Sequence, residues 1–319
     1  MIASWRIGAA TVTALSEYYG PVHVPDRLFP DLDRAVLREH RDLLEGRFWY
    51  EAIDRLVISV TLWIVTLAGR TILIDTGIGN GKTRRTPRAN MMNTVVPDWL
   101  AAAGAAPDQV TDVVMTHLHA DHVGWNTVRD GDHWVPTFPG ATYHVPRADF
   151  EHWAEIDRRG EAVDGGSFRD SVLPVVEAGL VRWTQAGDRV ADTLDAVSAR
   201  GHTPGQLAMW LRSEGRAAVF CGDILHHPVH VLRPEWNSVV DVEPDHAAAT
   251  RQAFLAEVAD RDVLVAPCHF APPHAAFVRR EADGYVFDPI GNGTALPAHA
   301  RPAQGASARK DLSASEKAI

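Results

Sequence analysis

The sequence predicts a layered domain of mixed β-sheets and helices, of the α/β or α+β class. Runs rich in β-branched residues alternate along the chain with segments that have helical spacing of apolar residues. No G-x-G-x-x-G motif follows the first strand-like run, which argues against a dinucleotide-binding fold. The 319 residues are also enough to bury a sizeable core.

The N-terminal half is expected to begin with strands. Its apolar runs contain many β-branched and aromatic side chains, which suit a pleated, half-buried surface. A glycine turn joins two of these runs into a hairpin, and a polar loop follows. The expected order is a strand at 5–15, a short surface helix at 31–45, strands at 56–67 and 71–77, a loop from 77 to 90, and a helix from 97 to 103.

Strands and helices alternate in the remainder of the chain. The expected elements are strands at 110–115 and 141–145, a helix at 147–157, antiparallel runs at 180–185, 189–199 and 206–212, a strand at 216–221, a helix at 244–259 and a strand at 263–266. Residues 298–319 have almost no large apolar side chain and are expected to form a disordered tail. The expected organisation is therefore one domain over 1–297, with an N-terminal extension of about 55 residues.

Composition and charge exclude several classes of function. The net charge of −10 argues against a nucleic-acid binder. No apolar run approaches the roughly 20 residues that span a bilayer, and the start of the chain lacks the features of a secretory signal. A cytoplasmic location, no membrane partner and a small-molecule substrate are therefore expected. The one basic cluster, Lys82 to Arg88, is interpreted as a solvated loop.

Histidine is the unusual component, with 16 residues against 5 tyrosines. Three of them, His117, His119 and His122, occur with Asp121 in six residues directly after the apolar run 110–115. Burying this many polar groups without partners costs several kcal/mol, so a core pattern is excluded. Imidazole and carboxylate are ligands suited to Zn²⁺ and also to Mn²⁺, Fe²⁺ or Co²⁺. The segment therefore predicts a metal site.

Further ligand-type residues follow later apolar runs. These are His202, Asp223 and His269, each placed where a strand is expected to end and where active sites of layered α/β proteins collect. With the first cluster they provide seven ligands, which is enough for two metals that share one carboxylate. Cys221 and Cys268 lie beside proposed ligands but are interpreted as small buried apolar residues.

This set of motifs resembles the metallo-β-lactamase superfamily. The matching residues are His117-x-His119-x-Asp121-His122, then His202, Asp223 and His269 in that order, with Asp75-Thr76-Gly77 ahead of them, and the resemblance covers roughly residues 5 to 290. It implies a four-layer αβ/βα sandwich of two mixed sheets. It also implies that His117, His119 and His202 hold one metal, that Asp121, His122 and His269 hold the other, and that Asp223 bridges them. Asp75 would orient a ligand.

The resemblance implies a dinuclear zinc hydrolase that uses a metal-bridging hydroxide as nucleophile. Asp121 could orient this group or carry its proton. The family supports many chemistries, and the chain is most similar to the group of acyl-homoserine lactonases and methyl parathion hydrolase. Trp125, Trp236 and Phe270 follow the ligands closely and could line an apolar pocket.

One departure from that group concerns the residues after Asp223. Typical acyl-homoserine lactonases have a tyrosine there, whereas this chain has His226 and His227. Either one of these histidines takes over as donor or acid, or the substrate differs from a homoserine lactone. The sequence therefore predicts hydrolysis of a small, fairly apolar lactone or ester, with organophosphate triesters as a side activity. The alternatives are an acyl thioesterase of a biosynthetic pathway and a non-catalytic metal-binding regulatory protein. A homodimer could form through the N-terminal segment.

Overall fold

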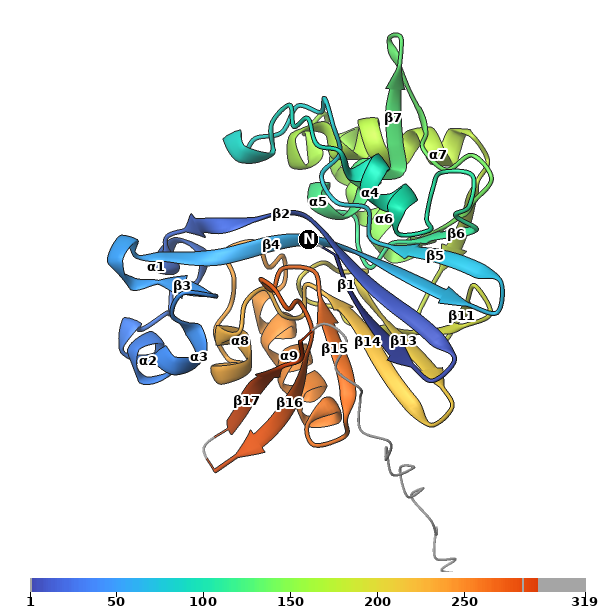
Figure 1. Ribbon diagram of the computed structural model, residues 1–319. Helices are drawn as coiled ribbons and strands as arrows, with labels where there is room; N and C mark the ends of the chain where they lie inside the picture. Colours follow the sequence, from blue (N-terminus) through green and yellow to red (C-terminus); the bar gives the residue numbers. More distant parts are fainter. Residues whose placement is uncertain (1, 283, 292–319) are drawn as a thin grey trace, which may run out of the picture.

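Two β-sheets lie face to face in the computed structural model, which describes residues 2–282 and 284–291 (Figure 1). The first sheet has the order β1-β2-β4-β5-β6-β9-β10, with β3 paired to β4. It is mixed, because β1 to β5 pair antiparallel while β5, β6, β9 and β10 run parallel. Its strands are β1 (Ile2–Ile7), β2 (Ala10–His23), β3 (Trp49–Tyr50), β4 (Arg55–Leu67), β5 (Arg70–Ile74), β6 (Asp112–Val114), β9 (Thr142–Pro146) and β10 (Val181–Thr184).

The second sheet follows the order of the sequence from β11 to β17. Its neighbouring strands are antiparallel except β14 and β15, which are parallel. The strands are β11 (Arg189–Val190), β12 (Leu194–Ser198), β13 (Leu207–Ser213), β14 (Arg216–Gly222), β15 (Val263–Pro267), β16 (Ala276–Glu281) and β17 (Gly284–Pro289). A separate hairpin of β7 (Thr127–Asp130) and β8 (His133–Pro136) projects from the molecule (Figure 1).

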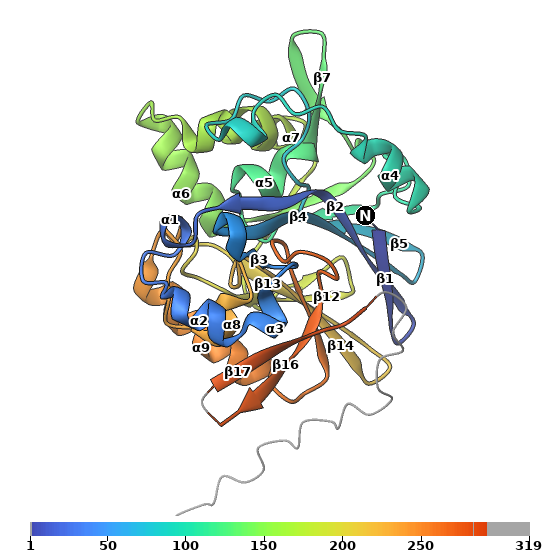
Figure 2. The ribbon, with the colours of Figure 1, turned by 60° about the vertical axis from the view of Figure 1, so that its left-hand side comes forward.

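Helices cover the outer faces of both sheets, as Figure 2 shows from a second direction. Those on the side of the first sheet are α4 (Val96–Ala102), α5 (Ala120–Val123), α6 (Arg147–Arg158) and α7 (Leu173–Glu177). Those on the side of the second are α2 (Arg34–Glu39), α3 (Arg41–Leu44), α8 (Val229–Leu232) and α9 (Pro244–Val258), and α1 (Pro25–Leu28) follows β2. Short turns of 3₁₀ helix occupy 51–53, 87–89, 124–126 and 163–166, and a π-helical turn occupies 168–172.

Three apolar cores separate these four layers. The central core lies between the sheets and joins residues such as Trp63 and Ile74 of the first sheet to Phe220 and Leu264 of the second. The other two cores lie between each sheet and its helices. The predicted αβ/βα sandwich of two mixed sheets is thereby confirmed.

Strand β4 shows why its sequence is an almost continuous apolar run. Leu62 and Ile64 belong to the core under the first layer of helices, whereas Trp63 and Val65 belong to the central core. Successive side chains of a strand point to opposite faces, so a strand buried on both faces needs apolar residues at every position. The same argument accounts for β15, which is buried throughout.

The predicted elements are largely found, with corrections to four of the predicted runs. The run 5–15 is a hairpin, because the chain turns at residues 8–9 between β1 and β2. Residues 31–45 contain two short helices, α2 and α3. The run 180–185 forms β10, which pairs parallel with β9 in the first sheet, and 189–199 divides into β11 and β12. The chain reaches β10 through the α6 to α7 crossover, which delivers it parallel to β9.

Other elements have no counterpart in the sequence prediction, and they include the β7–β8 and β16–β17 hairpins, several helices of four or five residues and the π-helical turn. The N-terminal segment contributes β1, β2 and β3 to the first sheet. The tail expected at 298–319 lies outside the described residues. Within the described residues, no helix combines the length and apolar character needed to cross a bilayer.

The basic cluster at 82–88 is only in part the solvated loop expected from its composition, because two of its cations are buried. Lys82 is fully buried and Arg84 nearly so. Both contact one carboxylate, Asp170, at 3.4 Å from Lys82 Nζ and 2.7 Å from Arg84 Nη1. Lys82 also donates to Thr127 and lies over the ring of Trp134. Burial lowers the pKa of Lys82 to about 8.

We expect Asp170→Ala to lower the free energy of unfolding by about 3–5 kcal/mol, because it leaves two buried cations without their counter-charge. Urea denaturation followed by circular dichroism measures this loss. Asp157→Ala is the matched control, since Asp157 pairs with the exposed Arg169 and such surface pairs contribute about 1 kcal/mol or less. Equal losses in the two variants would contradict the structural role given to Asp170.

Candidate metal centre

The predicted ligands meet because each follows the end of a strand at one edge of the sandwich. His117 comes after β6, His202 after β12, Asp223 after β14 and His269 after β15. β14 and β15 are parallel and pair at Gly222 and Pro267, so the chain leaves both strands at the same level. This placement is usual for active sites of layered α/β proteins.

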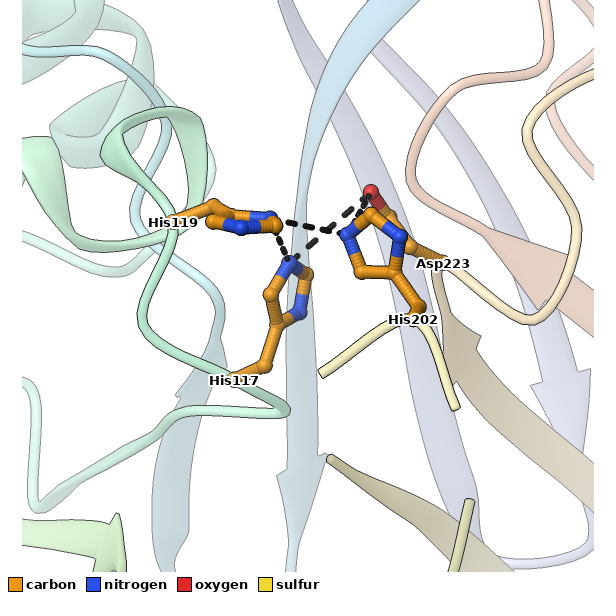
Figure 3. Close-up of side chains that lie close together, drawn as sticks. All are labelled: His117, His119, His202 and Asp223. Carbon is orange, nitrogen blue, oxygen red and sulfur yellow. Dashed lines mark hydrogen bonds and ion pairs between the residues drawn. The ribbon is translucent and has the colours of Figure 1, made fainter. Parts of the chain in front are cut away.

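One group of four ligand atoms gathers His117, His119, His202 and Asp223 (Figure 3). His119 Nδ1 lies 3.2 Å from His117 Nε2 and 2.8 Å from His202 Nε2. Asp223 Oδ2 lies 3.2 Å from His202 Nε2 and 3.8 Å from His117 Nε2. These four side chains thus form a compact donor set.

A second group of ligand atoms contains Asp121, His122 and His269. His122 Nε2 lies 3.8 Å from Asp121 Oδ1, and His269 Nε2 lies 3.7 Å from Asp121 Oδ2. Asp223 reaches this group as well, with Oδ1 at 3.3 Å from His122 Nε2 and Oδ2 at 3.1 Å from His269 Nε2. Asp223 therefore lies between the two donor sets.

Two atoms of the cluster indicate that the residues suit divalent metals. His122 Nε2 and Asp223 Oδ1 are buried and, apart from their mutual contact at 3.3 Å, have no hydrogen-bond partner in the described structure. A buried polar atom without a partner costs free energy unless it binds something else. Three or four His and Asp donors at each position match the coordination that Zn²⁺ and similar ions require.

The electrostatics of the cluster support the same conclusion. Burial lowers the pKa of His202 to about 3, which keeps the imidazole neutral and its lone pair free. Burial would raise the pKa of Asp223, but the surrounding imidazoles, His269 and His122 first among them, hold it well below its usual range. The pKa of His122 is raised because Asp223, Asp75 and Asp121 outweigh the effect of burial. The buried carboxylates thus favour cations at this place.

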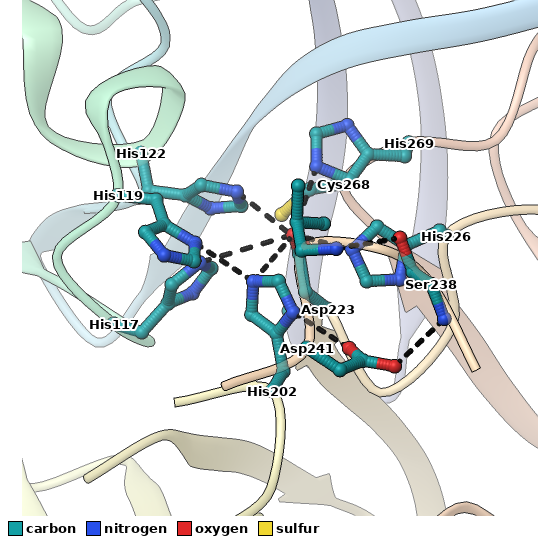
Figure 4. A network of polar contacts seen from close by, with 12 residues as sticks. His117, His119, His122, His202, Asp223, His226, Ser238, Asp241, Cys268 and His269 are labelled. Carbon is teal, nitrogen blue, oxygen red and sulfur yellow. Dashed lines mark hydrogen bonds and ion pairs between the residues drawn. The ribbon is translucent and has the colours of Figure 1, made fainter. Parts of the chain in front are cut away.

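The outer nitrogens of three candidate ligand imidazoles are fixed by hydrogen bonds, of which Figure 4 shows the one between His202 and Asp241. Asp75 Oδ2 accepts from His122 Nδ1 at 2.9 Å, and Asp241 Oδ1 accepts from His202 Nδ1 at 2.9 Å. The Ser59 carbonyl accepts from His269 Nδ1 at 2.7 Å. Such partners fix the tautomer and orientation of a ligand histidine.

Two ligand loops are tied together by Asp149 of α6. Its Oδ2 accepts from the Leu118 backbone N–H at 2.8 Å, and its Oδ1 accepts from the Gly205 N–H at 3.1 Å. The backbone approaches so closely here that a Cβ on Gly205 would lie 2.0 Å from the Asp149 nitrogen. Glycine is therefore required at this position.

A cavity of about 470 Å³ opens onto the cluster. The donor residues on its wall are His119, Asp121, His202, Asp223 and His269. His226 also lines it, with Nε2 at 3.2 Å from Asp223 Oδ2 and its ring stacked on that of His269. Apart from this contact with Asp223, the ring nitrogens of His226 have no polar partner among the described residues, so this histidine can offer a proton or a lone pair to a bound molecule.

The other predicted catalytic and pocket residues lie in the packed interior instead of on the cavity wall. His227 donates from Nε2 to the Phe48 carbonyl at 2.8 Å. Trp125 donates from Nε1 to Glu17 Oε1 at 2.8 Å. Trp236 and Phe270 belong to the core between the second sheet and its helices. His227, predicted as catalytic, and Trp125, Trp236 and Phe270, predicted for the substrate pocket, are therefore not among the residues that line this cavity.

Both cysteines are buried and free. Cys268 Sγ lies 3.2 Å from Asp75 Oδ2 and forms a small cluster with Asp75 and His122. Burial raises the pKa of the Cys268 thiol, which therefore stays protonated and can donate to Asp75. Cys268 thus contacts the carboxylate that accepts the hydrogen bond of the candidate ligand His122, whereas the sequence predicts only a small apolar residue at this position.

Several supporting residues were not found from the sequence, because their partners are remote in the chain. Glu17 accepts from the Ile78 and Gly79 N–H groups and from Trp125, and fixes the loop that follows Asp75. Asp149 and Asp241 each lie in segments without a recognisable motif. No local signal distinguishes these acids from surface acids.

The sandwich carries, at the ends of its strands, two adjacent groups of His and Asp side chains that could hold metal ions. The chain belongs to the metallo-beta-lactamase superfamily, whose family model matches residues 55–269. None of the curated proteins matches the sequence significantly. Membership of this superfamily, together with the groups of His and Asp side chains that could hold metal ions, supports the predicted class of metallo-hydrolase.

Solved structures share the fold over most of the chain. A hydrolase of the beta lactamase superfamily, AbOPH, has a TM-score of 0.75 and 24% identity, covering 92% of this chain and 98% of its own. AidC, a dizinc quorum-quenching lactonase, has a TM-score of 0.74 and 19% identity with the same coverage. A probable metal-dependent hydrolase from Staphylococcus aureus has a TM-score of 0.70 and 18% identity, covering 92% of this chain and all of its own.

Proposed function

We propose that the protein is a dinuclear zinc hydrolase that opens a small, fairly apolar lactone or ester, with organophosphate triesters as a side activity. The observation that carries this proposal is the pair of donor sets that share Asp223 inside one cavity. His117, His119 and His202 would hold one ion, Asp121, His122 and His269 the other, and Asp223 would contact both. The donor types suit Zn²⁺, and also Mn²⁺, Fe²⁺ or Co²⁺.

Two bound divalent ions would supply Lewis acidity toward a carbonyl oxygen and would lower the pKa of a water molecule. Around them, the side chains of the chain have separate tasks. Asp121 is about one-third exposed and lies on the cavity wall, where it can accept a proton from water. His226 lies across Asp223 and can donate a hydrogen bond or a proton to the oxygen that develops charge.

An uncharged acyl substrate suits the apolar part of the cavity. Leu28, Ile58, Val60 and Ile78 line this part and leave room for an acyl chain or an aromatic leaving group. The likeness in fold to AidC, described as a dizinc quorum-quenching lactonase, supports the same substrate class. A cytoplasmic location and a homodimer formed through the N-terminal segment stay predictions.

Metal analysis combined with a substrate panel tests the proposal. We expect two zinc ions per chain by mass spectrometry and the highest kcat/KM for a lactone or an aryl ester, compared with an acyl thioester and a phosphotriester. Removal of the metals by a chelator should abolish turnover, and Zn²⁺ should restore it. A thioester preference would favour the thioesterase alternative. No turnover of any substrate by the fully metal-loaded protein would contradict a hydrolase.

A further inference from the structure

The cavity has two chemically different walls. Its apolar wall contains Leu28, Ile58, Val60, Ile78, Val240 and Val242. Its other, basic part is formed by residues 84–89 of the loop between β5 and α4, from which Arg84, Arg85 and Arg88 line the cavity. A neutral lactone or ester needs only the first wall, so the basic wall requires its own explanation.

The charge of Arg84 is paired with a carboxylate inside the protein, whereas the charges of Arg85 and Arg88 are not. The guanidinium of Arg84 contacts both oxygens of Asp170. Arg85 donates to the Ala162 carbonyl, and Arg88 contacts His23 Nε2 at 2.6 Å. Within 2–282 and 284–291, no carboxylate lies at ion-pair distance from Arg85 or Arg88. Both are exposed, so the cavity mouth carries two arginines whose charges are not paired with a carboxylate of the described structure.

The partner of Arg88 does not add a competing charge. Burial lowers the pKa of His23 to about 4, with the charge of Arg88 as the next cause, so the imidazole is neutral and accepts from Arg88. Three carboxylates also face the cavity. Asp164 accepts from the Ala120 N–H through Oδ2, whereas Asp121 and Asp223 belong to the proposed metal ligands.

We propose that Arg85 and Arg88 form an anion subsite, and that the substrate is an ester or lactone with a carboxylate or similar anionic group remote from the scissile bond. This inference rests on the proposed function. An apolar stretch between the two ends of such a substrate would lie on Leu28, Ile58 and Val60. Arginine suits this role because its planar guanidinium binds carboxylates through two parallel hydrogen bonds.

A pair of substrates that differ in one charge tests the subsite. The probes are mono-p-nitrophenyl adipate and its methyl ester, which share the scissile bond and chain length. We expect the zinc-loaded enzyme to prefer the anionic probe at least tenfold in kcat/KM. In the double variant Arg85→Gln, Arg88→Gln this ratio should fall to about one, mainly through a higher KM for the anionic probe. High salt should lower the ratio in the natural protein.

Arg182→Gln is the matched control, because Arg182 is an exposed arginine on β10, away from the cavity, and this variant should keep the preference. Calorimetric titration with hexanesulfonate, a weak metal ligand, gives a readout independent of turnover and should show binding that the double variant loses. Equal kcat/KM for the two probes in the natural protein, or no change in their ratio in the double variant, would overturn the subsite. Such a result would leave the hydrolase intact, whereas no turnover of either probe would instead contradict the proposed function.

Discussion

Asp223→Ala is expected to lower kcat/KM by about four powers of ten or more. Asp223 contacts five histidines, and three of the candidate ligands among them, His202, His122 and His269, have nitrogens within 3.3 Å of its oxygens. Removing it takes a ligand from both donor sets at once, and Lewis-acid stabilisation contributes several kcal/mol, each 1.36 kcal/mol of which is a factor of ten in rate. Metal content measured by mass spectrometry should fall together with the rate.

The control for this prediction is Asp195→Ala. Asp195 lies on β12, where it contacts Arg189 and Arg212 at the surface. This variant should keep its metals and its rate, and circular dichroism should show that both variants are folded. If Asp223→Ala retained two metal ions and full turnover, Asp223 could not be the carboxylate shared by the two donor sets.

The ligand set could be predicted from the sequence because each ligand has a local signal. An apolar strand ends abruptly in residues such as His117 or Asp223, and the carboxyl ends of strands converge in space. The alternation of strands and helices predicted the layers for the same reason, since periodicity reports which faces are buried. Local patterns therefore sufficed for the fold class and for the candidate metal ligands.

The sequence could not predict which of these side chains point into the cavity and which point into the packed interior. His226 and His227 are neighbours, yet one faces the cavity and the other donates to the Phe48 carbonyl, 179 residues away in the chain. Trp125 is drawn inward by Glu17, 108 residues away. These long-range contacts decide which side chains reach the cavity, and nothing in the neighbouring sequence records them.

The buried charges illustrate the same limit. Lys82 and Arg84 lie in a segment whose composition is typical of a solvated loop. Their burial is stabilised by the carboxylate of Asp170, which is remote in the sequence and pairs with both cations. The loop is thereby fixed so that Arg85 and Arg88 lie at the cavity mouth. A basic run that looks like ordinary surface thus becomes part of the site through one carboxylate on another element.

His226→Phe is expected to lower kcat/KM by about 10²–10³, the loss that follows removal of one donor to a developing oxyanion. The phenyl ring can keep the stacking on His269, whose ring plane lies within 9° of parallel to that of His226 at a centroid distance of 5.6 Å. Metal content should therefore be unchanged, and the loss should fall on kcat more than on KM. His226→Tyr should recover part of the rate, because a phenol can donate from the same wall of the cavity.

A variant of His227 tests whether His226 or His227 is the donor to the developing oxyanion. His227 is fully buried and lies behind the cavity wall, so His227→Gln should lower stability by about 1–3 kcal/mol through its lost hydrogen bond. Its effect on kcat/KM should be less than tenfold when both variants are assayed well below their unfolding temperatures. A larger kinetic loss for His227→Gln than for His226→Phe would transfer the donor role to His227. The two residues are adjacent in the sequence, but only His226 lines the cavity. A difference in kcat/KM between the two variants therefore reports the position of the side chain in the cavity.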